Sequence, residues 1–434
     1  MNVSAKRLVR GAAGGTFRVP RFVPVLPRPV WVVLAADAAS AAGSGLTLPF
    51  LLVYLHTVRG LDVRWAGLAV SAVAFAGLLG NPAGGQLADR AGARNALVAG
   101  LVVAAAGSAA LVGAGSVPAA FVACGLLGLG AAIIWPAQDA LLGGLAAPEQ
   151  RSTVFAVRHA TMNFGLALGA AMSGLLADLS SAASFQRLYL LDALSFLLLI
   201  PVLTLCRGLA RRPPANIDEA DDGTRGFRHA IADRPFRWIW VWVSLAVAAG
   251  AAQFHAAFPA YATGEGGLTA GGLGIVYAAN CVTVLAVQLP VLKIMAGRRR
   301  THGMALVCLC WAAAWGLTLL ADGRLVVFAL AMVVFAVGET FLSPTVAPLV
   351  NDLAPAHSRG RYNGLHALAY TTGFIVGPAA CGLAFAGGAA AAFLVGCVAL
   401  LAVAAALTQR VERLLPAGLD LGRSGAPRPE EGST

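Results

Sequence analysis

The strongest constraint on the fold of this chain is a series of long apolar stretches joined by short polar segments. A helix that crosses a membrane needs about 20 mostly apolar residues. Hydrophobic residues make up 58% of the 434-residue sequence and charged residues only 12%, which excludes an ordinary soluble protein. We therefore predict an all-α integral membrane protein with twelve transmembrane helices. The predicted spans are residues 31–55, 65–88, 95–114, 117–141, 153–178, 185–206, 236–262, 270–295, 303–321, 324–350, 361–386 and 388–408.

Basic residues fall almost entirely on one side of this arrangement. With both termini inside the cell, all but four of the 31 Lys and Arg residues lie on the inner side. Because such residues are enriched in cytoplasmic loops, we predict a multi-pass protein with both termini cytoplasmic. The net charge of +11 then reflects topology and attraction to membrane lipid, with no nucleic acid implied. Arg far outnumbers Lys and Ala is abundant, as is typical of high-GC bacteria, so the expected location is a bacterial inner (plasma) membrane.

The sequence lacks the patterns of common membrane enzymes and pumps. Lysine occurs only at Lys6 and Lys293, and neither lies in a glycine-rich phosphate loop, which excludes an encoded Walker-type ATPase. The seven cysteines lack metal-ligand spacing and read as small packing residues. No loop offers a cluster of carboxylates or histidines, so a polytopic membrane enzyme is the least favoured alternative. We expect no enzymatic activity, no cofactor and no metal site.

The chain also contains an internal repeat. A shift of 208 residues superposes its halves without a gap through the fourth, fifth, tenth and eleventh stretches. The matched pairs are Pro136 with Pro344, Arg151 with Arg359, Gly165 with Gly373, Gly169 with Gly377 and Gly174 with Gly382. A duplicated six-helix unit explains this match. The predicted parts are a cytoplasmic N-terminal tail (1–30), an N-terminal six-helix bundle (31–206), a cytoplasmic linker (207–235), a C-terminal six-helix bundle (236–408) and a cytoplasmic C-terminal tail (409–434).

A compact polar motif joins the second and third stretches. Its residues are Gly85, Asp89, Arg90, Gly92 and Arg94. Asp89 falls near the C-terminal end of a predicted helix, where the helix dipole is already negative, so its carboxylate needs a partner. We predict that the partner is the N-terminal turn of the eleventh helix, around residues 359–364, and that the contact acts as a cytoplasmic gate.

This motif resembles the loop between helices 2 and 3 of the major facilitator superfamily, G-x-x-x-D-R/K-x-G-R/K-R/K, with Ala93 in place of one basic residue. The segment from Leu342 to Gly382 is similar to bacterial drug/proton antiporter-type efflux members. Gly165 and Gly169 resemble their helix-5 antiporter motif, although the usual proline is absent. The resemblance covers residues 31–408. It implies two pseudo-symmetric six-helix bundles that rock about a central substrate site.

The function implied by this resemblance is secondary active transport. The favoured form is proton-coupled export of an amphipathic small molecule or drug by alternating access. An uptake permease for a sugar or another metabolite is the alternative. The expected partners are a small-molecule substrate, protons and membrane lipid, and we expect the protein to be a monomer.

Few ionisable side chains fall inside the predicted spans. A charge at the bilayer centre costs about 2.5–3.5 kcal/mol on insertion scales, so such groups face the bundle interior or a wet cavity. Glu339, near the middle of the tenth helix, is the first candidate for proton coupling, and Asp37 is the second. Asp37 can instead form a structural ion pair with Arg158, and the sequence leaves both readings open. Three further groups are predicted to be structural or hydrogen-bonded packing residues: Asp192, His255 and His366.

Aromatic and polar side chains of the spans can line a cavity for an organic substrate. Most single aromatic residues of a membrane protein belong to the core or to the interface belt, so only some are expected to do so. The candidate lining residues are Trp135, Asn163, Phe254, Tyr261, Tyr277 and Tyr370.

Overall fold

The computed structural model shows an all-helical chain. It describes residues 26–147, 150–205, 230–355, 358–416 and 418–421. Most of the predicted tails and linker therefore lie outside the described residues. Within these ranges there is no strand, and eleven helical segments are long and apolar enough to cross a membrane. The predicted fifth span, the helix Arg151–Leu176, does not reach that criterion, because polar side chains in its first half lower its mean hydropathy.

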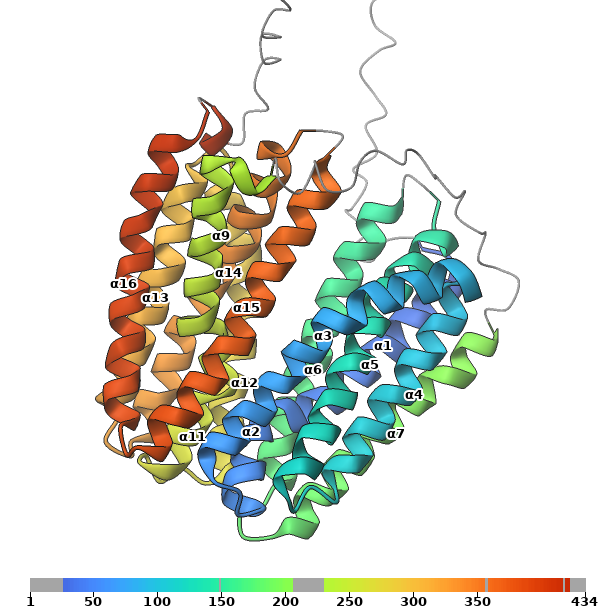
Figure 1. Cartoon of the computed structure of the whole chain (residues 1–434), viewed down its shortest axis with the longest axis vertical. Helices are drawn as coiled ribbons and strands as arrows, with labels where there is room; N and C mark the ends of the chain where they lie inside the picture. Colours follow the sequence, from blue (N-terminus) through green and yellow to red (C-terminus); the bar gives the residue numbers. More distant parts are fainter. Residues whose placement is uncertain (1–25, 148–149, 206–229, 356–357, 417, 422–434) are drawn as a thin grey trace, which may run out of the picture.

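The helices form two bundles that follow one another in the sequence and lie side by side in Figure 1. The N-terminal bundle, blue to green, contains α1 (Arg28–Thr47), η1 (Leu48–Phe50), α2 (Leu51–Val53), η2 (Tyr54–Val58), α3 (Val63–Ala91), α4 (Ala93–Leu111), α5 (Val117–Leu145), α6 (Arg151–Leu176) and α7 (Ala182–Leu205). The C-terminal bundle, yellow-green to red, contains α9 (Arg234–Ala246), η4 (Val247–Ala251), α10 (Ala252–His255), α11 (Ala257–Gly264), α12 (Ala270–Met295), α13 (Arg300–Leu319), α14 (Leu325–Leu353), α15 (Arg359–Ala386), α16 (Ala390–Leu414) and η6 (Leu419–Leu421).

The two bundles touch at one end and lie apart at the other (Figure 1). We call the end where α1 begins and α16 ends the tail end, and the opposite end the far end. At the far end α6 crosses α12, where a Cβ atom on Gly174 would lie 2.4 Å from the Cα of Gly274. There α15 also crosses α3, where a Cβ atom on Gly382 would lie 2.7 Å from the carbonyl oxygen of Val63. Glycine lets these backbones approach so closely, as small residues do at other membrane helix crossings.

The first helix of each bundle is broken at an equivalent position. α1 gives way to η1 at Leu48, beside Pro49, whose nitrogen carries no hydrogen to donate to the helix. In the C-terminal bundle the helix breaks at Ala256, which has φ −120° and ψ −76°. Leu48 and Ala256 are 208 residues apart, which is the offset of the sequence repeat. The duplicated unit therefore carries a helix interruption in both copies.

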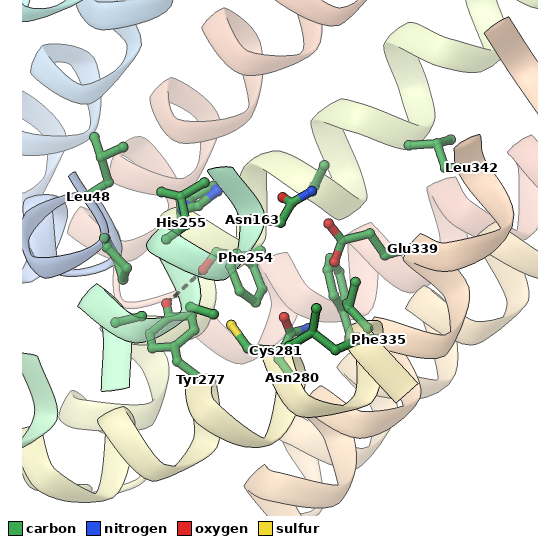
Figure 2. A pocket seen from close by; sticks show the side chains of 18 of the residues that line it. Leu48, Asn163, Phe254, His255, Tyr277, Asn280, Cys281, Phe335, Glu339 and Leu342 are labelled. Atoms are coloured by element: carbon green, nitrogen blue, oxygen red, sulfur yellow. Dashed lines mark hydrogen bonds between the residues drawn. The ribbon is translucent and has the colours of Figure 1, made fainter. Parts of the chain in front are cut away.

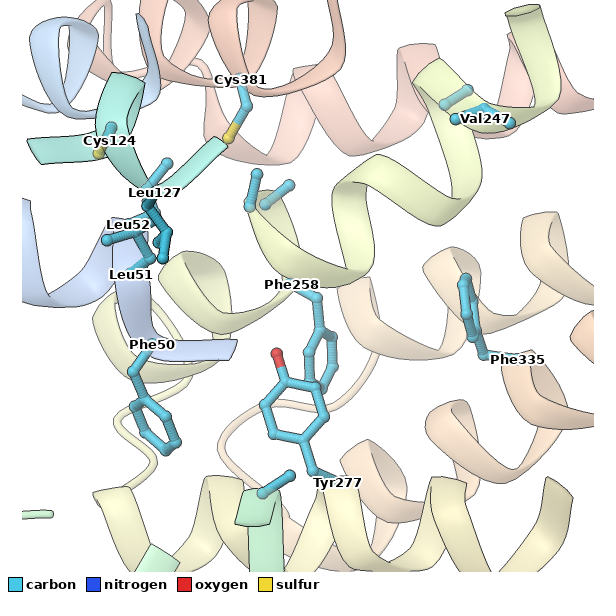
Figure 3. Close-up of a cluster of buried hydrophobic side chains, with 14 of the residues drawn as sticks. Phe50, Leu51, Leu52, Cys124, Leu127, Val247, Phe258, Tyr277, Phe335 and Cys381 are labelled. Carbon is cyan, nitrogen blue, oxygen red and sulfur yellow. The ribbon is translucent and has the colours of Figure 1, made fainter. Parts of the chain in front are cut away.

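Aromatic side chains fill the region where these broken helices meet (Figure 3). Tyr277 is buried, and its hydroxyl donates a hydrogen bond of 2.9 Å to the carbonyl oxygen of Phe254, close to the break at Ala256. Its ring lies 6.5 Å from that of Phe50 in the other bundle and 6.0 Å from that of Phe258. The core is therefore continuous across the two bundles on the far-end side of the molecule.

Polar residues cap several helices where they begin at the far end. The Asp62 carboxylate accepts a hydrogen bond from the backbone N–H of Arg64, and the Thr269 hydroxyl accepts one from Gly272. Such caps satisfy backbone donors that have no partner within the helix. Hydrogen bonds from Arg64 also hold the pKa of Asp62 below its usual range.

At the tail end, α13 begins at Arg300 without a cap from its own N-cap residue. Asp420 of η6 supplies one, because its carboxylate accepts hydrogen bonds of 2.9 and 2.8 Å from the backbone N–H and the hydroxyl of Thr301. Arg300 also forms an ion pair of 2.8 Å with Asp352 at the end of α14. The segment after α16 thus joins the tail ends of α13 and α14.

Removing this cap should loosen the first turn of α13. Asp420→Ala is expected to cost about 1 kcal/mol, which is typical for the loss of a helix cap. Hydrogen exchange at the first turn of α13 should become faster, while exchange in the middle of that helix stays unchanged. Asp420→Asn, which keeps one acceptor oxygen, is the matched control. Identical exchange in Asp420→Ala and the unmodified protein would contradict the capping role.

Candidate functional site

A cavity lies between the two bundles near the middle of the long helices (Figure 2). We call it the Glu339 cavity. Its volume is about 300 Å³. The N-terminal bundle contributes residues of α1, η1 and α6, and the C-terminal bundle contributes residues of α10, α12, α13, α14 and α15. A ligand held there would contact both bundles at once.

Glu339 is the charged carboxylate among the residues that line this cavity. It lies at the midpoint of α14, and its side chain is exposed to the cavity. Figure 2 shows it beside Phe335, one helical turn earlier. Among the described residues it has no hydrogen-bond or ion-pair partner. An unpaired carboxylate inside a membrane protein must bind a proton, a cation or water.

A second cavity adjoins the first, and we call it the Trp135 cavity. Its volume is about 360 Å³, and α3 and α5 supply most of its apolar lining residues. No charged residue other than a histidine lies among the described residues that line it. The two cavities have a set of lining residues in common: Leu48, His255, Tyr370 and Phe374. We call these four residues the shared wall.

The structure places five of the six predicted lining residues on these cavities. Asn163, Phe254, Tyr277 and Tyr370 line the Glu339 cavity, and Trp135 lines the other one. Tyr261 lines neither cavity and packs against the hydrophobic core instead.

The displacement of Tyr261 has a physical cause. It follows Phe254 by seven residues, which would place both on one face of an unbroken helix. The break at Ala256 changes the helical phase, so α11 turns Tyr261 away from the cavity. Pro259 is the sequence signal for this break, because its nitrogen has no hydrogen to donate to the carbonyl oxygen of His255, but the predicted seventh span runs straight through it.

Sequence reasoning missed several cavity residues that helical spacing could have identified. Phe335 and Leu342 lie four residues before and three after Glu339, on the same face of α14. Asn280 and Cys281 follow Tyr277 by three and four residues on α12. Phe374 on α15, four residues after Tyr370, was missed as well.

Arg158 lies at the centre of a buried polar cluster in the N-terminal bundle. Its Nε atom lies 3.6 Å from a carboxylate oxygen of Asp37, and both side chains are buried. It also forms an ion pair with Asp139 and donates a hydrogen bond of 3.0 Å to Gln138. The guanidinium carbon lies 4.6 Å from the ring centroid of Trp135, in cation–π geometry.

In this geometry Asp37 forms an ion pair with Arg158. This pair is the alternative, predicted from the sequence, to a role of Asp37 in proton coupling. Asp37 lines neither cavity. Asp139 and Gln138 were not predicted, because they fall at the boundary assigned to the fourth span, where a charge is expected to be solvated. Both residues closely follow Trp135, which was a predicted lining residue, and this closeness in the sequence could have indicated a place near the site.

Neutralising Arg158 should destabilise the protein more than neutralising Asp37. Arg158→Gln leaves two carboxylates without their partner, and breaking a buried pair costs about 3–5 kcal/mol. Asp37→Asn leaves Arg158 paired with Asp139, so its cost should be smaller. Adding Asp37→Asn to Arg158→Gln should recover part of the loss. Thermal unfolding of the three variants in detergent measures this order. Equal midpoints for the two single variants would contradict the cluster.

The other buried ionisable groups differ in their surroundings. The Asp192 carboxylate accepts hydrogen bonds from the hydroxyls of Ser44, Thr47 and Ser108 at 3.4, 3.2 and 2.8 Å, and so ties α7 to α1 and α4. His255 and His366 were expected to be hydrogen-bonded, but each has a buried ring nitrogen without a partner among the described residues. His255 belongs to the shared wall, so it is a cavity residue.

The polar motif forms the turn between α3 and α4 at the tail end. Gly92 has φ +86°, which favours glycine, and it allows α4 to begin directly after α3 ends. The Arg94 side chain donates a hydrogen bond of 3.0 Å to the Leu203 carbonyl of α7, and Arg90 is exposed. The side chain of Asp89 lies outside the described part of the chain. Nothing lies within 4 Å of a Cβ atom built on Gly85.

The predicted contact of Asp89 with residues 359–364 remains a prediction, to be tested by thiol labelling. Asp89→Asn should weaken any state in which the tail ends meet, and should therefore depress transport. Cys281 lines the Glu339 cavity, so its rate of labelling by an impermeant maleimide from the tail side should rise. Cys281→Ser supplies the background signal. Unchanged labelling together with unchanged transport would remove Asp89 from the gate.

No group of His, Cys, Asp or Glu side chains suited to a metal ion occurs in the described ranges. The site is instead a central cavity with one unpaired carboxylate, aromatic walls and contributions from both halves of a duplicated helical chain. Broken helices at the interface of two repeats are typical of substrate sites in secondary transporters.

Comparisons with known proteins agree with this architecture. The family model of the Major Facilitator Superfamily matches residues 33–378 and 256–426. An uncharacterized MFS-type transporter of Bacillus subtilis, YttB, is 22% identical over 364 residues, covering 81% of this chain and 87% of its own. The quinolone resistance protein NorA of Staphylococcus aureus is 27% identical over 161 residues, covering 37% and 41%.

Solved structures share the fold. The nucleoside transporter NupG superposes with a TM-score of 0.73 at 12% identity, covering 89% of this chain and 99% of that one. A POT family transporter bound to a thioalcohol-conjugated peptide superposes with a TM-score of 0.71 at 15% identity, covering 89% and 96%. From the match of the family model, together with the two bundles and the cavity between them, we conclude that this chain is a membrane transporter of the major facilitator superfamily.

Proposed function

We propose that this transporter exports amphipathic small molecules in exchange for protons. The observation that carries the proposal is the unpaired Glu339 carboxylate in a cavity that both bundles line. One carboxylate can hold a proton or face a cationic ligand, and binding of either disfavours binding of the other. Competition at one site is sufficient to couple the two movements in opposite directions.

The shape of the molecule supports alternating access by rocking of the two bundles. The glycine crossings close the far end, while the tail ends lie apart (Figure 1). In our proposal residues 31–206 and 236–408 move as two bodies about the central cavity, and the tail end faces the cytoplasm of a bacterium. The protein would act as a monomer, because both halves of the site belong to one chain.

The cavity favours an amphipathic ligand over a sugar. Aromatic and aliphatic side chains make up most of its lining, and the side chains with clearly polar groups are few: Asn163, His255, Tyr277, Asn280, Cys281, Glu339 and Tyr370. A sugar needs many hydrogen-bond partners to replace its water, whereas an apolar wall with few polar groups suits drug-like molecules. The likeness to the quinolone resistance protein NorA also favours export. Uptake of a sugar or another metabolite remains the second candidate.

Transport by purified protein in liposomes with an imposed pH gradient tests the proposal. The panel contains lipophilic cations, neutral antibiotics and sugars. We expect a pH gradient to drive accumulation of at least one amphipathic compound and of no sugar. Sugar movement down its own gradient, with no response of amphipathic compounds to pH, would overturn export in favour of uptake.

A further inference from the structure

We infer that the Glu339 cavity and the Trp135 cavity are two chambers of one binding site, which takes a single elongated organic cation with its charged head beside Glu339 and its apolar tail in the Trp135 cavity. The inference rests on the proposed function and adds to it the shape of the ligand and the residues that select its length. The inference is drawn from the difference in charge between the two cavities, from their volumes and from the shared wall.

The chambers differ in charge. The Glu339 cavity contains one carboxylate without a partner among the described residues. The Trp135 cavity is lined mainly by Ala, Val, Leu and Gly side chains, and Asn81 and Thr371 are the polar residues outside the shared wall and Trp135. A cationic group gains most from the first chamber, and a hydrocarbon chain gains most from the second.

Each chamber is also small for a ligand site. Their volumes of about 300 and 360 Å³ each lie at the lower limit of small-molecule sites, which span about 300–1,000 Å³. A molecule that passes from one chamber to the other would use both volumes. Its head and tail would then be bound by different bundles, since α14 supplies Glu339 while α3 and α5 supply most of the apolar wall.

The shared wall can open without breaking hydrogen bonds. Leu48 and His255 lie at the breaks of the first helix in each bundle, and Tyr370 and Phe374 lie one turn apart on α15. No hydrogen bond joins the side chain of any of these four residues to another described residue, and a ring nitrogen of His255 is buried without a partner. Ring contacts hold the wall, with the centroids of His255 and Phe374 6.3 Å apart. Rotation of these side chains would therefore connect the chambers.

Chain-length dependence of binding tests this arrangement. The probes are alkyltrimethylammonium ions from butyl to dodecyl, and the measurement is the Kd for the purified full-length protein in nanodiscs. In the unmodified protein Kd should fall by up to about fourfold for each added methylene, until the Trp135 cavity is filled, and then level off. Glu339→Gln should weaken all members of the series by a similar factor.

Gly77→Leu should narrow the Trp135 cavity and leave the fold intact. Gly77 lines this cavity, and nothing lies within 4 Å of a Cβ atom built on it. In this variant the Kd should stop falling at a shorter alkyl chain than in the unmodified protein, and the difference in length should match the number of carbons that Leu adds. The Kd of the butyl member should stay unchanged. Ala74→Leu, on the same wall, should act similarly. Gly125→Leu is the matched control, since Gly125 also has open space but lines neither cavity.

Two results would overturn the inference. In one, the Kd levels off at the same alkyl chain length in Gly77→Leu as in the unmodified protein. In the other, Gly77→Leu weakens the binding of short and long alkyltrimethylammonium ions equally. Binding needs no pH gradient, whereas the proposed export does. A protein that shows the predicted length dependence but no pH-driven accumulation would therefore contradict the export proposal and leave the two-chamber site standing.

Discussion

Replacing Glu339 with Gln is expected to reduce pH-driven accumulation of substrate to the level of protein-free liposomes. The amide keeps the size of the side chain and, like a protonated carboxyl group, both donates and accepts hydrogen bonds, but it cannot gain or lose a proton. Because Glu339 has no ion-pair partner among the described residues, its neutralisation leaves no opposite charge stranded, and the protein should fold normally. Exchange of a neutral substrate across the membrane without a gradient should persist.

Paired assays separate coupling from general damage. The driven assay measures accumulation under a pH gradient, and the exchange assay measures counterflow of labelled against unlabelled substrate. Glu265→Gln is the matched control, since Glu265 is exposed after α11 and lies on neither cavity. Full pH-driven accumulation by Glu339→Gln would exclude Glu339 from coupling. The proton role would then pass to the cluster of Asp37, Arg158 and Asp139.

The fold was predictable from the sequence because its main signals are local. Apolar stretches of membrane length appear as helices, and the repeat offset recurs in the breaks at Leu48 and Ala256. Glycines matched by the repeat also pack in equivalent places: a Cβ atom on Gly165 would meet α1, and one on Gly373 would meet the first helix of the C-terminal bundle. Because the unit is duplicated, each of these features occurs twice at the same offset, and chance matches in the sequence would not recur in this way.

The site was only partly predictable, because its composition depends on helical phase and on pairing between distant helices. Tyr261 was misplaced because the helix was predicted to run unbroken through Pro259, whereas the break at Ala256 changes the helical phase. Asp139 was missed because it lies near the end of the fourth predicted span, where a charge is expected to be solvated, and only the packing of α6 beside α5 brings it to Arg158. The separation of the tail ends was equally invisible, since one sequence specifies both states of a rocking transporter.

Adding a methyl group at the far-end crossings should shift the protein away from the state seen here. A Cβ atom on Gly174 would lie 2.4 Å from Gly274, and one on Gly382 would lie 2.7 Å from the Val63 carbonyl oxygen. Such overpacking costs about 1–3 kcal/mol, so each Gly→Ala change should disfavour the far-end-closed state by about 5- to 150-fold. Transport should fall with it, because a carrier must return to this state in every cycle.

Labelling of Cys281 from the tail side reports this shift, since closing the tail end would shield the Glu339 cavity. Gly174→Ala and Gly382→Ala should each slow labelling. They are equivalent under the repeat, so their double variant should slow it further. Gly316→Ala, on α13 near the same end and with open space beside it, is the matched control and should label normally. Faster labelling in the glycine variants would mean that the crossings hold the bundles together in both states. The far-end contact would then be a fixed hinge and not a gate.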